Sequence, residues 1–231
     1  MSADDRFVEI IRQAARVIVA VGGIIVVTRQ VRKPAWFVGR WIVRTMNRSH
    51  AGLRAWALER IAIGPDATVL DVGCGGGATI AAIAAAGAGR RVFGVDFSDA
   101  SVTVARETNA RFIAEARVAI QPASVSALPF DADTFDVVTA FETHFYWPDL
   151  PADVKEIQRV LKPGGRVALV AEVYGGRSMD WLYRPAMGML RAHYLTPDEH
   201  RELLTRAGYL DVDVVVERTK GWILATGRRP G

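Results

Sequence analysis

The chain has 231 residues, half of them hydrophobic and 23% charged, with a formal net charge of +4. This is an ordinary globular composition, long enough for one sizeable α/β domain with or without a small appendage. The single cysteine, Cys74, excludes an intramolecular disulfide framework and fits a reducing compartment. We therefore expect a cytoplasmic protein.

Residues 1–47 are predicted to form an N-terminal extension that precedes a domain over residues 48–231. The extension contains eleven uninterrupted apolar residues, from Val17 to Val27, which are too few to span a bilayer. The sequence "TRQVRKP" follows this run, and it does not resemble a signal-peptide cleavage site. We expect a buried element or a homodimer contact, with peripheral membrane association as the alternative.

Much of the positive charge lies in the first sixty residues, where arginines alternate with Trp36, Phe37 and Trp41. Such a segment could contact nucleic acid or anionic lipid. No nucleic-acid-binding motif accompanies it, so a solvated basic face beside a core-facing aromatic stripe is favoured. No nucleic-acid partner is expected.

From residue 47 onward, helical and strand patterns alternate. A helix over 47–61 ends at Gly64-Pro65, and β-branched runs then alternate with Ala-rich or amphipathic runs. The predicted strands are 68–72, 91–96, 117–123, 135–142 and 166–173, and the predicted helices between them are 76–86, 98–116 and 151–161. This alternation predicts a doubly wound, Rossmann-like α/β fold with a parallel sheet covered on both faces.

The C-terminal part departs from this alternation. A helix is predicted over 196–209, with Thr196 as its cap and Pro197 as its first residue. Strands 211–217 and 221–227 follow, only three residues apart. Because so short a gap allows a hairpin and no crossover helix, the seven-stranded sheet should be mostly parallel and close with an antiparallel hairpin.

The stretch "DVGCGGG" at 71–77 joins the first strand to its helix through a glycine-rich turn, where a ligand can approach free helix N–H groups. Gly73-x-Gly75-x-x-Ala78 satisfies the relaxed dinucleotide pattern, and Asp96 ends the second strand, where an acid can bind ribose hydroxyls. Asp71 argues against a pyrophosphate, because its carboxylate would repel one. It favours a cofactor that carries an ammonium and a sulfonium.

Four stretches in the correct order resemble motifs of the class I S-adenosylmethionine-dependent methyltransferases. They are "VLDVGCGGG", "VFGVDFS", "ASVSALPFDADTFDVV" and "VLKPGGRVAL", within a resemblance over about residues 47–227. The resemblance implies S-adenosylmethionine as cofactor, S-adenosylhomocysteine as product and a small-molecule methyl acceptor. It also matches the antiparallel hairpin inferred above from the spacing of the last strands.

The resemblance implies a set of cofactor-binding positions at the ends of the first, second and fourth strands and in the loop after the third strand. The backbone around Gly73 and Gly75 would hold the methionine part, Asp71 its amino group, Asp96 the ribose and Phe97 the adenine. Ser124 replaces an aspartate that many family members have near the adenine amine, which weakens that expected contact. The full set is Asp71, Gly73, Cys74, Gly75, Asp96, Phe97, Ser124, Val125 and Phe141.

The acceptor is expected beside "FETHFYWPDL" at 141–150, which follows the fourth strand. His144 and Glu142 are the candidate general bases, although Glu142 could instead bind the polar end of the cofactor. The candidate substrate-binding residues are His50, Tyr146, Trp147 and Trp181, each of which could also be a packing residue. No His/Cys cluster has metal-ligand spacing.

We thus predict an S-adenosylmethionine-dependent methyltransferase for a small apolar or aromatic molecule, with O-methylation favoured and C-methylation next. One alternative is a nicotinamide-dependent oxidoreductase, which would use the same turn and Asp96. The other is a membrane-surface or binding protein on a vestigial methyltransferase fold, with the N-terminal 47 residues as the working part.

Overall fold

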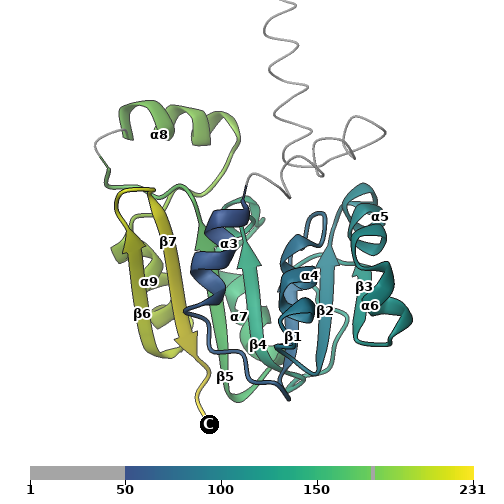
Figure 1. Cartoon of the computed structure of the whole chain (residues 1–231). Helices are drawn as coiled ribbons and strands as arrows, with labels where there is room; N and C mark the ends of the chain where they lie inside the picture. The colour runs from purple at the N-terminus through teal and green to yellow at the C-terminus, as the bar shows by residue number, and fades with distance from the viewer. Residues whose placement is uncertain (1–49, 178–179) are drawn as a thin grey trace, which may run out of the picture.

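The computed structural model describes residues 50–177 and 180–231, and the predicted extension over 1–47 lies outside these ranges. A seven-stranded sheet with the order β3-β2-β1-β4-β5-β7-β6 forms the centre of the domain (Figure 1). The strands are β1 (Thr68–Val72), β2 (Arg91–Asp96), β3 (Val118–Pro122), β4 (Phe135–Phe141), β5 (Leu161–Ala171), β6 (Leu210–Glu217) and β7 (Trp222–Arg228). Strands β1 to β5 pair in parallel, and β7 pairs antiparallel with both β5 and β6.

Helices cover both faces of the sheet. They are α3 (Ala51–Leu58), α4 (Ala78–Ala85), α5 (Asp99–Thr108), α6 (Ala110–Ala114), α7 (Leu150–Val160), α8 (Asp180–Met189) and α9 (Pro197–Arg206), with a 3-10 turn η1 at His144–Tyr146. Side chains of α3, α4 and α5 form one buried cluster with Val69 and Val137 of the sheet. Side chains of α7 and α9 form another with Leu70 and Val138, the next residues along the same strands. This alternation follows from the two-residue period of a strand.

The predicted fold class is confirmed. The antiparallel hairpin predicted from the short gap between the last two strands is also present. Strands β6 and β7 are joined by a turn and lie side by side at the edge of the sheet (Figure 1). The fifth strand is longer than predicted, because "KPGG" at 162–165 lies inside β5 as an irregularity in its pairing with β4. Gly164 has a φ of +78°, which suits glycine in such a bulge.

The helix predicted over 98–116 is two helices, α5 and α6, that meet at Asn109. The Asn109 side chain is fully buried, and its amide donates 2.9 Å hydrogen bonds to the carbonyls of Gly77 and Ala105. These two hydrogen bonds therefore hold the end of α5 against the glycine-rich turn. Ser98 caps α5 as the sequence predicts, accepting a hydrogen bond from the Ser101 N–H.

Helix α8 lies beyond the carboxyl ends of the parallel strands (Figure 1). It contains Pro185, and its Met187 packs with Tyr174 and Phe145 in a third, smaller buried cluster. Within residues 50–177 and 180–231, every helix is too short or too polar to cross a membrane.

Candidate functional site

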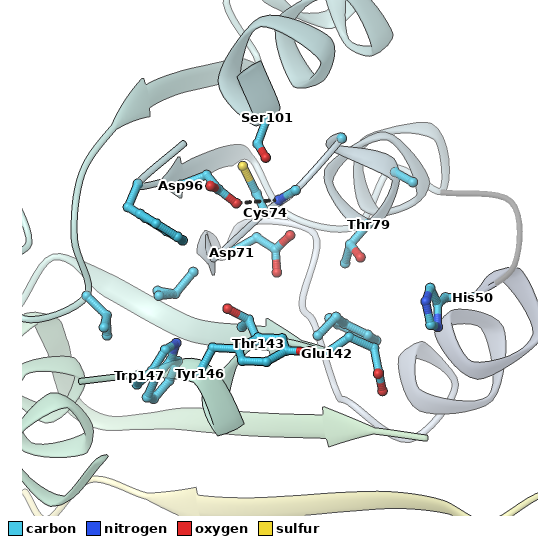
Figure 2. Close-up of a pocket in the computed structure, with 18 of the residues that line it drawn as sticks. His50, Asp71, Cys74, Thr79, Asp96, Ser101, Glu142, Thr143, Tyr146 and Trp147 are labelled. Atoms are coloured by element: carbon cyan, nitrogen blue, oxygen red, sulfur yellow. Dashed lines mark hydrogen bonds between the residues drawn. The ribbon is translucent and has the colours of Figure 1, made fainter. Parts of the chain in front are cut away.

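A cavity of about 380 Å³ opens at the carboxyl ends of β1, β2 and β4, next to the start of α3. This edge of an open parallel sheet, beside the strand where the order reverses, is where such folds bind ligands. Figure 2 shows Asp71 near its centre, Asp96 and Ser101 on one side, and Glu142 and His50 on another. The cavity is therefore ringed by acids from three neighbouring strand ends.

The glycine-rich turn forms one wall of the cavity, and its glycines are required for different reasons. Gly73 has a φ of +69°, and a Cβ atom there would lie 2.1 Å from Thr143 Oγ1. Gly75 has a φ of +51°, with no heavy atom within 4 Å of the place where its Cβ would be. Gly73 thus allows close packing against the end of β4. Gly75 instead borders open space, which leaves room for a ligand.

Asp71 is buried at the end of β1, opposite Thr139 of the neighbouring strand β4. The Thr139 hydroxyl donates a 2.7 Å hydrogen bond to Asp71 Oδ1. Burial outweighs this bond and raises the pKa of Asp71 to about 7, with repulsion from Asp96 adding to the rise and attraction to Arg54 opposing it. A cation bound in the cavity would therefore meet a carboxyl group that deprotonates near neutral pH.

Asp96 at the end of β2 joins the two turns that border the cavity. Its Oδ2 accepts a 2.9 Å hydrogen bond from the Gly75 N–H, and its Oδ1 accepts one of 2.9 Å from the Ser98 N–H (Figure 2 shows the first). Burial nevertheless raises its pKa, although these hydrogen bonds oppose the rise. The neighbouring Phe97 is half exposed, with its side chain at the cavity.

At the other end of the cavity, Glu142 after β4 and Glu172 after β5 lie close to His50, the residue that precedes α3. Glu142 Oε1 accepts a hydrogen bond from the Glu172 N–H, and burial together with the nearby Glu172 charge raises the pKa of Glu142 to about 8. Glu142 has a φ of +57°, uncommon for a residue other than glycine. The Glu172 carboxylate in turn lies 3.3 Å from Nδ1 of His50, within ion-pair distance.

Most of the residues predicted from the sequence lie together around this cavity. Its lining includes all the predicted cofactor positions, namely Asp71, Gly73, Cys74, Gly75, Asp96, Phe97, Ser124, Val125 and Phe141. It also includes Glu142, His50, Tyr146 and Trp147 of the predicted catalytic and substrate-binding residues. The roles of these residues stay predictions.

Two predicted residues lie elsewhere. Trp181 is on α8, is 75% exposed and does not line the cavity. His144 is buried outside the lining, and its Nε2 lies 3.1 Å from Nε2 of His200 on α9. His200 Nδ1 is 2.8 Å from the Thr196 carbonyl and must donate to it, so His144 donates through Nε2. Burial and the neighbouring His200 hold the pKa of His144 well below its usual value.

Sequence reasoning missed several cavity residues. Arg54 is on the first turn of α3, Thr79 is on α4, and Thr143 follows β4. Burial lowers the pKa of Arg54, while its attraction to Asp71 opposes that shift. Glu172, which contacts the cavity residue His50 without itself lining the cavity, was also missed, although it directly follows β5 and the rule that ligands lie at strand carboxyl ends points to it. No local pattern marks the other three.

Comparison with known proteins identifies the family. A methyltransferase-domain family matches residues 70–169, from strand β1 to strand β5, which contain most of the cavity wall. Residues 70–169 therefore form a methyltransferase domain, in line with the resemblance of the sequence motifs to the class I S-adenosylmethionine-dependent methyltransferases. The prediction of a methyltransferase domain is thereby confirmed, and the family match argues against the nicotinamide-dependent alternative.

The curated relatives of this methyltransferase domain act on different kinds of molecule. Methyltransferase GfsG of Streptomyces halstedii is 37% identical over 53% of this chain and 44% of its own length. Nocamycin O-methyltransferase of Saccharothrix syringae is 36% identical over 55% of this chain and 44% of its own. The C-methyltransferase UbiE of Geotalea daltonii, named for ubiquinone/menaquinone biosynthesis, is 33% identical over 51% of this chain and 50% of its own. The chain thus spans about half the length of these relatives.

Solved structures share the methyltransferase fold. A putative methyltransferase in complex with the Haloferax volcanii Trm112 methyltransferase activator aligns with a TM-score of 0.72 and 24% identity, over 82% of this chain and 94% of its own. Geranyl diphosphate C-methyltransferase of Streptomyces coelicolor A3(2), solved with S-adenosyl-L-homocysteine, aligns with a TM-score of 0.65 and 18% identity, over 79% of this chain and 77% of its own. At these identities the likeness is one of fold.

Proposed function

We propose that this protein transfers the methyl group of S-adenosylmethionine to a small apolar or aromatic molecule, with oxygen as the favoured acceptor atom and carbon next. The observation that carries the proposal is the cavity at the carboxyl edge of β1, β2 and β4, where a glycine-rich turn opens between buried acids. A cofactor with an ammonium and a sulfonium is complementary to such a site.

The lining of the cavity supports a placement for each part of S-adenosylmethionine. Asp96, which already orders the turn through the Gly75 and Ser98 N–H groups, would bind the ribose hydroxyls, with the half-exposed Phe97 beside the adenine. Ser124 and Val125 would border the adenine from the loop after β3. Asp71 would lie close to the amino group, while the open space at Gly75 leaves room for the methionine part.

The acceptor is proposed to lie between the cofactor and the segment after β4. Tyr146 and Trp147 give the cavity an aromatic wall, and Glu142 and His50 also line it. The named relatives include both O- and C-methyltransferases, which supports a small-molecule acceptor and leaves the two atoms as ranked alternatives. Because a sulfonium methyl is already activated, the protein mainly has to align the acceptor and exclude water.

Calorimetric titration with S-adenosylhomocysteine and S-adenosylmethionine tests the cofactor site. The full chain should bind both, and Asp96→Ala should weaken binding at least about ten-fold, because each hydrogen bond to a charged acceptor contributes about 1.5–3 kcal/mol. Asp99→Asn, an exposed acid on α5, is the matched control and should bind normally. Undiminished binding by Asp96→Ala, or preferential binding of NADH, would overturn the assignment of this site.

Methyl transfer itself is tested with methyl-labelled S-adenosylmethionine and a panel of phenols, catechols, hydroquinones and isoprenoid quinols. We expect label in at least one of these compounds, on oxygen, with S-adenosylhomocysteine formed in equal amount. Transfer only to carbon would reverse the ranking of the two atoms. Cofactor binding without transfer to any member of the panel would overturn the proposed acceptor class while leaving the cofactor site intact.

A further inference from the structure

His50 and Glu172 meet at the acceptor end of the cavity, although they belong to distant parts of the chain. His50 directly precedes α3 and lines the cavity, and Glu172 directly follows β5. His50 Nδ1 lies 3.3 Å from Glu172 Oε2, with the two side chains 23% and 32% exposed. This Nδ1 atom is enclosed, and within the described residues it has no aligned hydrogen-bond acceptor.

The carboxylate decides which nitrogen of His50 carries the proton. An enclosed ring nitrogen that faces a carboxylate is favoured as the donor, because a bare lone pair there would be repelled by the negative oxygen. With the proton on Nδ1, the lone pair of neutral His50 is on Nε2. A histidine oriented in this way by a carboxylate is the arrangement that allows an imidazole to accept a proton from a reacting group.

The other candidate bases are less suited. Glu142 is largely protonated at neutral pH, since its pKa is about 8, and one of its oxygens already accepts the Glu172 N–H. His144 does not line the cavity, and its Nε2 is paired with His200. His50 is left as a cavity-lining imidazole with a carboxylate partner, opposite the wall formed by Tyr146 (Figure 2).

We propose that His50 is the general base of the methyl transfer and that Glu172 is the positioning residue that holds its proton on Nδ1. This inference rests on the proposed function. His50 Nε2 accepts the proton of the acceptor hydroxyl while the oxygen lone pair forms the new bond to the methyl carbon. The carbon–sulfur bond breaks, its electron pair stays on sulfur as neutral S-adenosylhomocysteine, and the imidazolium faces Glu172 until it releases its proton to water.

The ring protons can be located directly by nitrogen NMR of the full chain with ¹⁵N-labelled histidine, saturated with S-adenosylhomocysteine. The four histidines are assigned by single substitutions to Gln. We expect neutral His50 to carry its proton on Nδ1, and its signals to move when S-adenosylhomocysteine is added. Glu172→Leu should shift the proton towards Nε2, whereas Glu172→Gln, which keeps an acceptor oxygen, should leave it on Nδ1.

His200 is an internal reference, because its Nδ1 donates to the Thr196 carbonyl whatever the state of Glu172. Glu202→Gln, an exposed acid on α9, is the matched control for Glu172→Gln. A His50 proton on Nε2 in the unaltered chain would overturn the proposal, as would a tautomer that Glu172→Leu does not change. Should Glu172→Leu fail to fold, the tautomer in the unaltered chain still decides.

Kinetics with the panel compound of highest turnover test the role of the base. His50→Gln should lower kcat by about 10²–10⁴-fold, the usual effect of losing a general base, while affinity for S-adenosylhomocysteine stays within about two-fold. Glu172→Leu should lower kcat at least about ten-fold, and Glu172→Gln should recover part of that loss. A His50→Gln enzyme with unchanged kcat would overturn the proposal, whereas lost S-adenosylhomocysteine binding by the unaltered chain would instead overturn the proposed function.

Discussion

Gly73 links the glycine-rich turn to the end of β4 through a contact that only glycine permits. A Cβ atom there would lie 2.1 Å from Oγ1, 2.7 Å from Cβ and 2.9 Å from Cγ2 of Thr143. We predict that Gly73→Ala lowers the free energy of unfolding by about 2–5 kcal/mol, since an unfavourable positive φ costs about 1–2 kcal/mol and overpacking about 1–3 kcal/mol more. Urea denaturation measures this loss.

Gly75→Ala is the matched control, because Gly75 also has a positive φ but nothing lies within 4 Å of its Cβ position. It should lose only the backbone part, about 1–2 kcal/mol. Adding Thr143→Gly to Gly73→Ala should recover the steric part of the loss and leave the backbone part. Equal losses for Gly73→Ala and Gly75→Ala would contradict the steric role of Thr143.

Asp71 should couple cofactor binding to the release of a proton. Its pKa is raised to about 7 in the protein without ligand, mainly by burial, and an ammonium or sulfonium nearby would lower it. We therefore predict that S-adenosylmethionine binds more tightly as pH rises from 6 to 8, by up to about ten-fold per pH unit for each proton released.

Calorimetry in buffers of different ionisation enthalpy counts those protons. Asp71→Asn, which keeps an oxygen able to accept from Thr139, should weaken binding and reduce the number of protons released. Glu142, with a pKa raised to about 8, should supply the remainder at the upper end of the range. Binding with no proton exchange at pH 7 would contradict the raised pKa of both carboxyl groups.

At the scale of elements, the sequence predicts those features that depend on local pattern. The periodicity of apolar residues predicts the strands and helices of the sheet. The three residues between the last two predicted strands predict the antiparallel hairpin. The break at Asn109 was missed because it depends on the carbonyl of Gly77, far away in the chain. The sequence leaves helix α8 as one of two interpretations of residues 174–195, because Pro185 inside it disfavours a helix on propensity alone.

The residues of the candidate site also fall into a predictable group and an unpredictable group. Asp71, Asp96 and Glu142 were predictable because they end strands whose carboxyl ends share one edge of the sheet. The contact between His50 and Glu172, and the packing of Thr143 on Gly73, were not predictable. Both contacts join segments that are distant in the sequence and meet only in the folded chain. No spacing in the sequence therefore indicates either contact.

Tyr209 lies between α9 and β6, and its side chain contacts two further elements, α7 and β7. Its hydroxyl donates a 3.1 Å hydrogen bond to the Val154 carbonyl of α7, and its Cβ would lie 2.9 Å from a Cβ added to Gly227 of β7. We predict that Tyr209→Phe lowers the free energy of unfolding by about 0.5–1.5 kcal/mol, the usual net value of one hydrogen bond. Urea denaturation with an unchanged m-value would report it.

Gly227→Ala should cost about 1–3 kcal/mol by overpacking against Tyr209, whose ring cannot move away without losing its bond to α7. Tyr183→Phe, on helix α8, is the matched control for removal of a tyrosine hydroxyl and should change stability by less than about 0.5 kcal/mol. A Tyr209→Phe protein as stable as the unaltered chain would mean that the α7 contact contributes nothing to docking of the hairpin.

At the scale of the whole molecule, buried acids and buried histidines give stability opposite dependences on pH. The pKa values of Asp71 and Glu142 are raised to about 7 and about 8, from 3.8 and 4.5, so the folded chain binds protons that the unfolded chain does not. Their contribution is present at low pH and is lost as pH rises through 7 and 8. The pKa values of His144 and His200 are lowered from 6.5, mainly by burial, so their contribution is lost as pH falls below 6.5.

Between pH 7 and pH 8 the unfolded histidines are largely neutral and the unfolded Cys74 thiol, whose pKa burial raises in the folded chain, is still mostly protonated, so the acids determine the slope. We predict that the free energy of unfolding falls between pH 7 and pH 8, by at most about 1.4 kcal/mol per pH unit for each proton, as measured by urea denaturation at fixed ionic strength. Glu142→Gln keeps an acceptor for the Glu172 N–H and removes the titration, so it should flatten the fall. Glu202→Gln on the exposed face of α9 should leave the slope unchanged, and equal slopes for both variants would contradict the raised pKa of Glu142. Saturating S-adenosylmethionine should reduce the fall as well, because a bound cation favours the ionised acids that otherwise destabilise this edge of the sheet.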